Sequence, residues 1–427
     1  MFHSSCSQWD VFLIWKFLRR RSALLWYEIK MKVAFITHYT SLYGANRSLL
    51  NLIDGLSKYD DVIPYLISPS KGEVTKALEP RNVPIAIFPI KEWTSHQFKS
   101  TNKPLKNLQA YIRFRLGSVK RLYLNLLLLQ PLVNQLQKWE IDIVYTNSSV
   151  IPIGFFAAKS LGRPHVWHLR EFCDLDYGLS FDLGFGIQKR IIKSSDAFFV
   201  MSEAICQHFL DNLEQERVHI IYDGVISQAE MDSYYQQNQH KDNNQRAYTF
   251  LIIGLLHPAK GQDEAIKALS IVRSKFPTTR LLIFGSGNKN YLNYLKNLTH
   301  ELDLKNNIEF KGYVQNPYTA YLQSDAVLMC SKNEGMGRVT VEGMSACKPV
   351  IGYDNAGTSE LIEHEHTGLL YSHGHEELAS NMLRLLENPE FGYEMGENAW
   401  QIARHKFTIE SYADSVYRVL SSINSNS

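Results

Sequence analysis

Cysteine is scarce in this chain of 427 residues, which contains five cysteines at Cys6, Cys173, Cys206, Cys330 and Cys347. No two of them form a C-x-x-C pair, so their spacing argues against a zinc site or a thiol redox site. An odd and scattered set of cysteines is typical of reduced thiols in a cytosolic protein. We therefore expect a cytoplasmic protein without a metal centre.

The chain also lacks long apolar runs, a strong charge imbalance and internal repeats. No segment reaches the roughly 18 consecutive apolar residues that a membrane-spanning helix needs. The net charge is only +2, from 45 basic and 43 acidic side chains, which does not favour a nucleic-acid partner. Because no period of about 20–50 residues occurs, a repeat architecture is excluded. The composition is that of an ordinary soluble protein.

A chain of this length exceeds the usual limit for one hydrophobic core, so we expect two domains. Short β-branched runs alternate with helical patterns in both halves, which predicts a parallel sheet covered by helices in each. The strands that we expect lie at 33–37, 62–67, 85–88, 143–146, 165–168 and 197–201, and then at 248–253, 280–284, 308–310, 326–330 and 349–352.

The predicted domain boundaries follow the composition. Residues 31–225 form the first domain, and the polar residues 226–247 form a linker or an exposed excursion. Residues 248–405 form the second domain, and 406–427 form a helix that packs back on the first domain. Two such halves place a ligand in the cleft between them, at the carboxyl ends of the strands.

The first 30 residues combine a short apolar stretch with basic residues. A signal peptide is not indicated, because no small-residue cleavage site follows the stretch. One interpretation is a start codon assigned too early, with Met31 beginning the first strand. The other is a basic amphipathic segment on a membrane surface.

The most informative segment contains two glutamates, Glu334 and Glu342, that are separated by seven residues. The first opens a turn at Gly335–Gly337, and the second falls in the helix expected after that turn. A Gly-rich loop that enters a helix offers backbone N–H groups and a positive dipole end to an anion. Carboxylates accept hydrogen bonds from sugar hydroxyls. One short segment thus suits both phosphate and polyol, which predicts a nucleotide-sugar site.

Further motifs occur in order around this segment. They are Ser195–Ala197, Ser202–Ala204, Ile221–Val225, Gly254–Gly261, Ile283–Gly287, Phe310–Val314, Lys348–Gly352, Gly357–Ile362 and Gly368–Tyr371. Together they resemble glycosyltransferase family 4, a group of retaining enzymes with the GT-B fold, in which two Rossmann-like α/β domains face each other across a cleft. The resemblance is weak over residues 31–420 and strong over 250–371.

The resemblance implies a role for each matching residue. Glu342 would bond the ribose hydroxyls of a nucleoside diphosphate-sugar. The implied catalytic residues are Glu334 beside the donor sugar, Lys260 on the diphosphate and His168, which would contact the sugar from the first domain. The other implied donor-binding residues are Gly335, Met336, Gly337, Gly254, Gly44, Tyr313 and Val314.

The chain departs from the family at one phosphate-binding position. Leu255 stands where the family usually has an arginine, and Arg338 or His257 could replace the missing cation. Asp174 and Asp176 form a D-x-D pattern. That metal motif belongs to a transferase fold with one nucleotide-binding domain, and three residues match easily by chance. We therefore expect a metal-independent reaction without a cofactor.

Residues 99–138 form a basic segment with interleaved apolar residues. No acidic residue occurs between Glu92 and Glu140, whereas eight Lys and Arg residues do. Such a helix suits an anionic lipid surface, at about 1 kcal/mol per basic residue. That partner would fit a lipid-linked acceptor and a place on the inner face of the cell membrane. The alternative is an ordinary helix with solvated charges.

The sequence therefore predicts a retaining glycosyltransferase. It would move a hexose-type sugar from a nucleoside diphosphate to a growing glycan or a lipid-linked acceptor. The resemblance alone implies bacterial surface polysaccharide assembly and front-side attack, in which the departing phosphate helps to take the acceptor proton. The alternatives are a GT-B nucleotide-sugar epimerase and, because of Leu255, a weakened nucleotide-sugar-binding protein.

Overall fold

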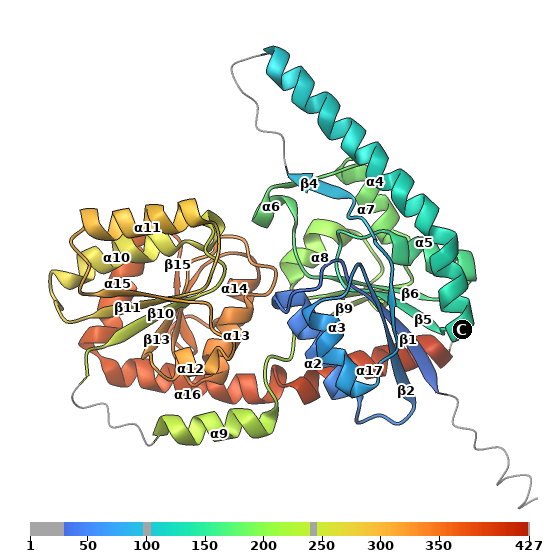
Figure 1. Cartoon of the computed structure of the whole chain (residues 1–427). Coiled ribbons are helices and arrows are strands. Elements are labelled where there is room, and N and C mark those ends of the chain that lie inside the picture. Colours follow the sequence, from blue (N-terminus) through green and yellow to red (C-terminus); the bar gives the residue numbers. More distant parts are fainter. Residues whose placement is uncertain (1–29, 97–103, 240–245, 426–427) are drawn as a thin grey trace, which may run out of the picture.

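The computed structural model describes residues 30–96, 104–239 and 246–425, and it contains two α/β domains (Figure 1). The first domain holds a seven-stranded parallel sheet in the order β3-β2-β1-β5-β6-β8-β9. Its strands are β1 (Met31–Ile36), β2 (Val62–Ser68), β3 (Ile85–Ile87), β5 (Ile143–Thr146), β6 (His165–Leu169), β8 (Ala197–Val200) and β9 (Val218–Ile220).

The second domain holds a six-stranded parallel sheet in the order β12-β11-β10-β13-β14-β15. Its central strands are buried along almost their whole length, as expected where helices cover both faces of a parallel sheet. The prediction of two parallel α/β domains is therefore confirmed. The strands are β10 (Thr249–Ile253), β11 (Arg280–Phe284), β12 (Ile308–Gly312), β13 (Ala326–Met329), β14 (Val350–Tyr353) and β15 (Gly368–Tyr371).

Helices and an antiparallel strand pair surround the first sheet. The strand pair consists of β4 (Thr94–His96) and β7 (Leu179–Phe181). The helices are α2 (Gly44–Leu56), α3 (Glu73–Leu78), α4 (Pro104–Trp139), α5 (Ile153–Leu161), α6 (Asp174–Tyr177), α7 (Phe185–Lys193) and α8 (Glu203–Leu210), with the 3₁₀ turns η1 (Glu79–Arg81) and η2 (Gln215–Arg217).

The remaining helices follow the first sheet in the chain. They are α9 (Gln228–Gln239), α10 (Gln262–Arg273), α11 (Lys289–Glu301), α12 (Tyr318–Tyr321), α13 (Arg338–Ser345), α14 (Ala356–Leu361), α15 (Gly374–Glu387), α16 (Pro389–Lys406) and α17 (Ile409–Ser425), with the 3₁₀ turn η3 (Pro258–Lys260).

The last helix, α17, returns the chain to the first domain, where it packs on α2 (Figure 1). Its apolar face is buried in one cluster with Leu49, Leu52 and Ile53 of α2. The contact is close, because a Cβ on Gly55 would lie 2.6 Å from the Cβ of Ala413. The end of the chain therefore belongs to the core of the first domain.

The polar segment 226–247 contains helix α9. Its aromatic residues contact the second domain: Tyr235 stacks on Trp400 of α16, and Tyr234 stacks on Tyr318. Asp232 also forms an ion pair with Arg404 of α16. The segment thus lies on the second domain over much of its length. The expectations for residues 1–30 lie almost entirely outside the described residues.

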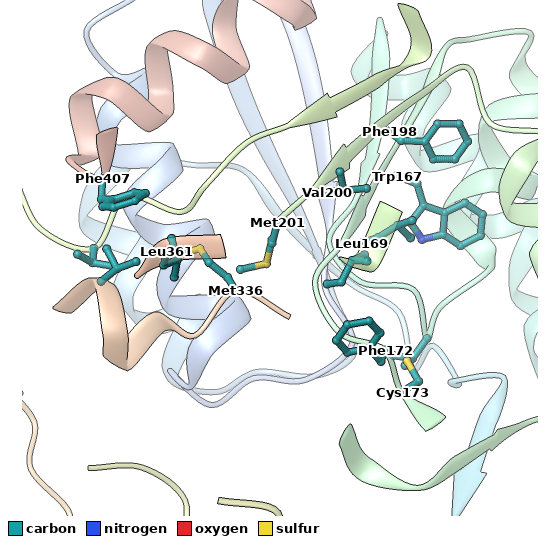
Figure 2. Close-up of a cluster of buried hydrophobic side chains, with 14 of the residues drawn as sticks. Trp167, Leu169, Phe172, Cys173, Phe198, Val200, Met201, Met336, Leu361 and Phe407 are labelled. Carbon is teal, nitrogen blue, oxygen red and sulfur yellow. The ribbon is translucent and has the colours of Figure 1, made fainter. Parts of the chain in front are cut away.

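One apolar cluster crosses the boundary between the domains. Met201 and Ile205 of the first domain belong to the same buried cluster as Met336 and Leu361 of the second. Figure 2 shows Met336 and Leu361 beside Met201, with Phe407 on the other side of this pair. The facing domains are therefore in direct apolar contact beside the Gly-rich loop.

Candidate functional site

The Gly-rich loop between β13 and α13 lies against the first domain. Gly337 has a φ of 79° directly before α13, a conformation that favours glycine. A Cβ on Gly335 would lie 2.4 Å from the carbonyl oxygen of Arg170 in the opposite domain. Met336 is buried, and its sulfur accepts a hydrogen bond of 3.2 Å from the backbone N–H of Asp223. The loop thus forms part of the domain contact.

Lys260 at the end of η3 forms an ion pair with Glu334. The side chains are 23% and 14% exposed, so the pair is partly shielded from water. Burial alone would lower the pKa of Lys260, but the charge of Glu334, followed by that of Tyr177, raises it above its usual range. The ammonium therefore stays charged. A fixed cation beside a carboxylate can bind a diphosphate and stabilise the charge that the diphosphate gains as it departs.

Glu342 on α13 is buried, with both carboxylate oxygens held by protein donors. Arg338, one turn earlier, donates its Nε to Oε1 at 2.9 Å. The hydroxyl of Tyr321 donates to Oε2 at 3.0 Å. Each carboxylate oxygen retains capacity for a further hydrogen bond. The carboxylate is therefore fixed in place and can still accept from hydroxyl groups.

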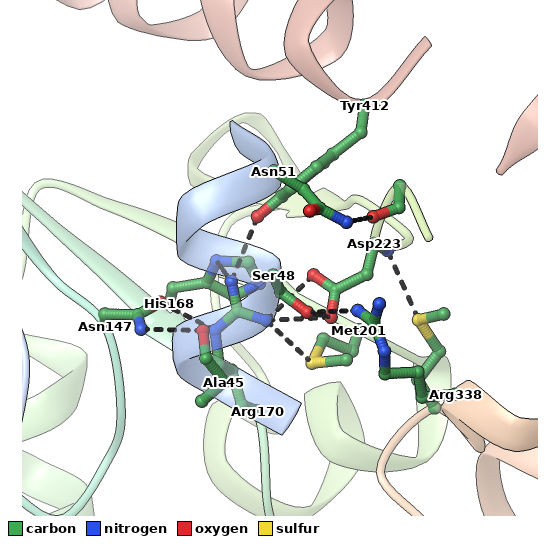
Figure 3. A network of polar contacts seen from close by, with 12 residues as sticks. Ala45, Ser48, Asn51, Asn147, His168, Arg170, Met201, Asp223, Arg338 and Tyr412 are labelled. Carbon is green, nitrogen blue, oxygen red and sulfur yellow. Dashed lines mark hydrogen bonds and ion pairs between the residues drawn. The ribbon is translucent and has the colours of Figure 1, made fainter. Parts of the chain in front are cut away.

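A polar network continues from Glu342 into the first domain, and Figure 3 shows the part that starts at Arg338. Arg338 donates its Nη1 to the Ser48 hydroxyl on α2 at 2.8 Å. Ser48 in turn hydrogen-bonds Asp223, which forms a two-pronged ion pair with Arg170 at 2.8 and 2.9 Å. The side chains of Asp223 and Arg170 are only 2% and 3% exposed, so each depends on the other for its charge balance.

His168 lies inside this buried network rather than on an exposed face. Arg170, which can only donate, approaches its Nδ1 at 3.1 Å, and the Tyr145 hydroxyl contacts the same atom. Nδ1 is therefore the acceptor, and the neutral ring carries its proton on Nε2, which has no partner among the described residues. Burial, followed by the charge of Arg170, lowers the pKa of His168 well below its usual range. The ring is a neutral hydrogen-bond donor.

The other predicted donor-binding residues fall on both sides of the domain boundary. Gly44 begins α2, where a Cβ would meet nothing within 4 Å. Arg47, in the same turn, donates to the carbonyl of Gln315 at 3.2 Å. That contact brings α2 beside the loop that holds Tyr313 and Val314. In a separate loop, Gly254 has a φ of 152°.

Leu255 occupies the position where the family resemblance implies a phosphate-binding arginine. The Leu255 side chain is 45% exposed. Burial and the charge of Lys260 lower the pKa of His257, whose ring nitrogen accepts from the N–H of Ala259. His257 is therefore a poor substitute for an arginine. Arg338, at the first position of α13, is held by Glu342 and Ser48.

A cavity of about 390 Å³ adjoins the Lys260–Glu334 pair without being lined by it. Its wall comes from α6 on one side and from η3, the start of α10 and the residues before Glu334 on the other. Burial, followed by the charge of Glu171, raises the pKa of Asp176 in this wall to about 7. Asp176 accepts hydrogen bonds from the backbone N–H groups of Phe172 and Tyr177, which hold its carboxylate against the backbone around α6.

Sequence reasoning missed four members of the network: Ser48, Arg170, Asp223 and Tyr321. They come from α2, from the ends of β6 and β9, and from α12, so no local spacing connects them. Two signals were available: Arg170, a charged residue directly after a strand with the pattern of a buried core strand, and the motif Ile221–Val225, which contains Asp223. The buried partner of such a residue can be found only after the strands are placed.

Two family models match the chain. The model for "Glycosyl transferases group 1" matches residues 235–401. The model for "Glycosyltransferase Family 4" matches residues 43–228. Among curated proteins, an uncharacterised glycosyltransferase of Haemophilus influenzae is 29% identical over 35% of this chain and 43% of its own length. A poly(glycerol-phosphate) alpha-glucosyltransferase of Bacillus subtilis is 28% identical over 39% of this chain and 25% of its own length. The chain thus spans about half or less of the length of these relatives.

Solved structures match over a larger share of the chain. A structure of Anabaena HepE in complex with UDP superposes with a TM-score of 0.71 and 22% identity, covering 92% of this chain and 100% of that one. At this identity the match establishes the fold, and that fold is GT-B. The two family models, which together cover most of the chain, show that it belongs to glycosyltransferase family 4.

Proposed function

We propose that this protein is a retaining glycosyltransferase that moves a sugar from a nucleoside diphosphate-sugar to a glycan or a lipid-linked acceptor. The observation that carries the proposal is the contact between Lys260 and Glu334. The contact lies at the start of the Gly335–Gly337 loop, and Glu342 follows in the next helix. A phosphate-binding cation, a sugar-binding carboxylate and a ribose-binding carboxylate are thus contributed by adjoining parts of one domain.

Each of these groups has a distinct task in the proposed reaction. Lys260 neutralises the diphosphate and stabilises it more strongly as its negative charge grows during departure. Glu334 accepts from a hydroxyl of the donor sugar and stabilises the cationic, oxocarbenium-like sugar of the transition state. Glu342 accepts from the ribose hydroxyls. The departing phosphate oxygen takes the acceptor proton, so transfer occurs on one face with retention.

The first domain supplies the rest of the donor site in this proposal. His168 donates from Nε2 to the sugar, and Gly44 lets the backbone of α2 approach the donor or the acceptor. Tyr313 and Val314 contact the base, and Gly254 lies beside the diphosphate. The contact of Arg47 with Gln315 supports this arrangement, because it brings α2 beside the proposed base loop. The complex of Anabaena HepE with UDP makes a uridine donor the first choice.

A panel of UDP-, GDP- and ADP-sugars tests the proposal against its alternatives. Calorimetry identifies the donor, and turnover is then measured with and without a crude bacterial lipid extract. A transferase requires an acceptor and keeps the anomeric configuration, which NMR of the product reports. An epimerase releases free sugar products without any acceptor. Binding with no turnover, even with the extract, supports the weakened binding protein that Leu255 suggested.

We also propose that α4 holds the enzyme on an anionic membrane surface, the inner face of the cell membrane. The helix is apolar on its outward face, where side chains three or four residues apart are 47–74% exposed. They are Leu105, Leu108, Ile112, Leu116, Val119, Tyr123 and Leu126. This stripe is about 33 Å long at 1.5 Å per residue. Among the described helices, none has the length and apolarity needed to cross a bilayer.

The opposite face of α4 is anchored to the first domain, so the stripe has no partner within the described chain. Ser118 and Arg121 hydrogen-bond Asp182, and Asn125 bonds both backbone groups of Lys91. Exposed basic residues flank the outward stripe, and the helix has no acidic residue. Two copies of α4 placed face to face would bring like charges together, which disfavours a second copy as the partner. An anionic lipid surface complements both features.

Sedimentation with liposomes tests the membrane proposal. The protein should sediment with vesicles that contain phosphatidylglycerol at low salt and should remain in solution with pure phosphatidylcholine. The variant Leu116→Gln with Tyr123→Gln should lose this binding. The matched control, Tyr294→Gln with Tyr393→Gln, changes exposed aromatic residues of the second domain and should bind as the wild type does. If the wild type forms a concentration-dependent dimer and the α4 variant does not, the partner of the stripe is a second copy of the chain rather than a membrane.

A further inference from the structure

Arg338 connects the two domains through a single guanidinium. Its Nε binds Glu342 within the second domain at 2.9 Å. Its Nη1 binds Ser48 in the first domain at 2.8 Å (Figure 3). The guanidinium is rigid and planar, so a movement of Glu342 also shifts the nitrogen that binds Ser48. The carboxylate that we assign to the ribose is therefore linked mechanically to α2 of the opposite domain.

Ser48 extends the hydrogen-bond network into the first domain, because its hydroxyl can accept one hydrogen bond and donate another. It accepts from Arg338, so its own proton is available for Asp223. Asp223 is held by Arg170, which also donates to His168 and to the Tyr412 hydroxyl on α17 at 3.0 Å. A continuous chain of hydrogen bonds thus runs from Glu342 to His168.

We propose that Arg338 and Ser48 are positioning residues that couple nucleotide occupancy at Glu342 to the placement of α2 and the buried network of the first domain. The inference rests on the proposed function, which assigns Glu342 to the nucleotide. A ribose hydroxyl that donates to Glu342 withdraws negative charge from the carboxylate and weakens its hold on the guanidinium. Arg338 then binds Ser48 more strongly, and α2 is held more firmly over the nucleotide.

A second contact between the domains provides a control, because it does not involve Glu342. The carboxylate of Glu360 on α14 accepts from the backbone N–H groups of Glu203 and Ala204, both at 2.8 Å, at the start of α8. Loss of this contact should loosen the domains in general. Loss of the Arg338–Ser48 contact should remove the coupling that runs through Glu342, while the Arg47–Gln315 contact between α2 and the second domain remains in place.

Hydrogen exchange on the full-length protein, with UDP as the probe, tests the coupling. In the wild type, UDP should slow amide exchange in the 334–345 segment and also in α2. In Ser48→Ala and in Arg338→Lys, the effect on 334–345 should persist, with roughly three- to tenfold weaker UDP binding. The UDP effect on α2 should become clearly smaller in both variants and persist at its full size in Glu360→Gln. If α2 responds to UDP equally in all four proteins, the coupling is overturned.

A measurement without nucleotide separates this inference from the proposed function. In the protein alone, Ser48→Ala and Arg338→Lys should each speed α2 exchange, and the double variant should speed it by less than the product of the two factors, because both changes remove the same Arg338–Ser48 contact. If the effects of the two single changes on α2 exchange add up fully in the double variant, Arg338 and Ser48 do not act through one contact. That result would overturn the inference independently of the UDP experiment. A wild type that shows no response to UDP would instead count against the assignment of Glu342 to the nucleotide.

Discussion

Glu342 is held by Arg338 and Tyr321 in a position from which it can accept ribose hydroxyls. Replacing it by glutamine keeps the shape but removes the charge that strengthens such hydrogen bonds. We expect Glu342→Gln to weaken UDP binding by about 10- to 100-fold, or roughly 1.5–3 kcal/mol, as measured by calorimetry. Glu390→Gln, at an exposed position of α16, should bind as the wild type does. Equal affinities for all three proteins would contradict the ribose assignment.

Lys260 is expected to act on the transition state more than on the bound donor. Lys260→Met should lower kcat by roughly 100-fold, a loss of about 3 kcal/mol of electrostatic stabilisation. The single change also leaves Glu334 without its partner, which lowers stability. Adding Glu334→Gln should restore the melting temperature but not the turnover. A double variant with wild-type turnover would show that the pair serves the fold alone.

Asp176 gives a pH dependence of stability with a defined sign. Its pKa in the folded protein, about 7, lies above the ordinary value of 3.8, so the folded state holds the proton more tightly. Ionisation therefore costs stability increasingly as pH rises from about 4 to about 7, and the full cost applies above that. We expect Asp176→Asn to raise the melting temperature more at pH 8 than at pH 5. An equal change at both pH values would contradict this environment.

At the scale of single residues, the sequence predicted the groups that lie on one loop and missed those that meet across the fold. Lys260 and Glu334 are 74 positions apart, yet both belong to motifs that could be recognised, and they are in contact. Arg170 and Asp223 follow the ends of strands that are not neighbours, so their pairing depends on the strand order. His168 lies in the buried network because Arg170, one member of this pair, also donates to its ring.

The contact between α2 and α17 sets a limit on side-chain size. A Cβ on Gly55 would lie 2.6 Å from the Cβ of Ala413 and 2.9 Å from the backbone of Ile409. Gly55→Ala should therefore destabilise the protein by about 1–3 kcal/mol through overpacking. Gly117→Ala on α4, where the new Cβ meets only the end of the flexible Arg121 side chain, should be neutral or stabilising. Chemical denaturation compares the two, and equal effects would contradict the packing.

At the scale of elements, periodicity predicted the parallel strands whose faces are buried, but it missed β9 and β15, which lie at the edges of the two sheets. The helix α9 was harder to foresee. Its sequence is polar over most of its length, and its few aromatic residues gain partners only from α16 and α12. For the exposed stripe of α4, the helix could be predicted but its exposure could not. Its apolar residues have helical spacing, but the sequence could not show which of them face outward.

At the scale of the whole molecule, the two domains are in direct contact beside the proposed site. Apolar residues of both domains form one buried cluster, and the backbone of Gly335 is pressed against that of Arg170. The sequence predicted two facing domains because two α/β patterns flank a polar segment. It could not predict this closeness, because the size of Met336 and the absence of a side chain at Gly335 matter only once the domains meet.

The central claim is that the second domain binds a nucleoside diphosphate at Lys260, Glu334 and Glu342. A crystal structure of the protein with UDP tests this claim most directly. The account predicts phosphate oxygens within hydrogen-bonding distance of the Lys260 ammonium and ribose hydroxyls on the Glu342 carboxylate. UDP bound elsewhere, with the Lys260–Glu334 pair and the Glu342 carboxylate both untouched, would contradict it.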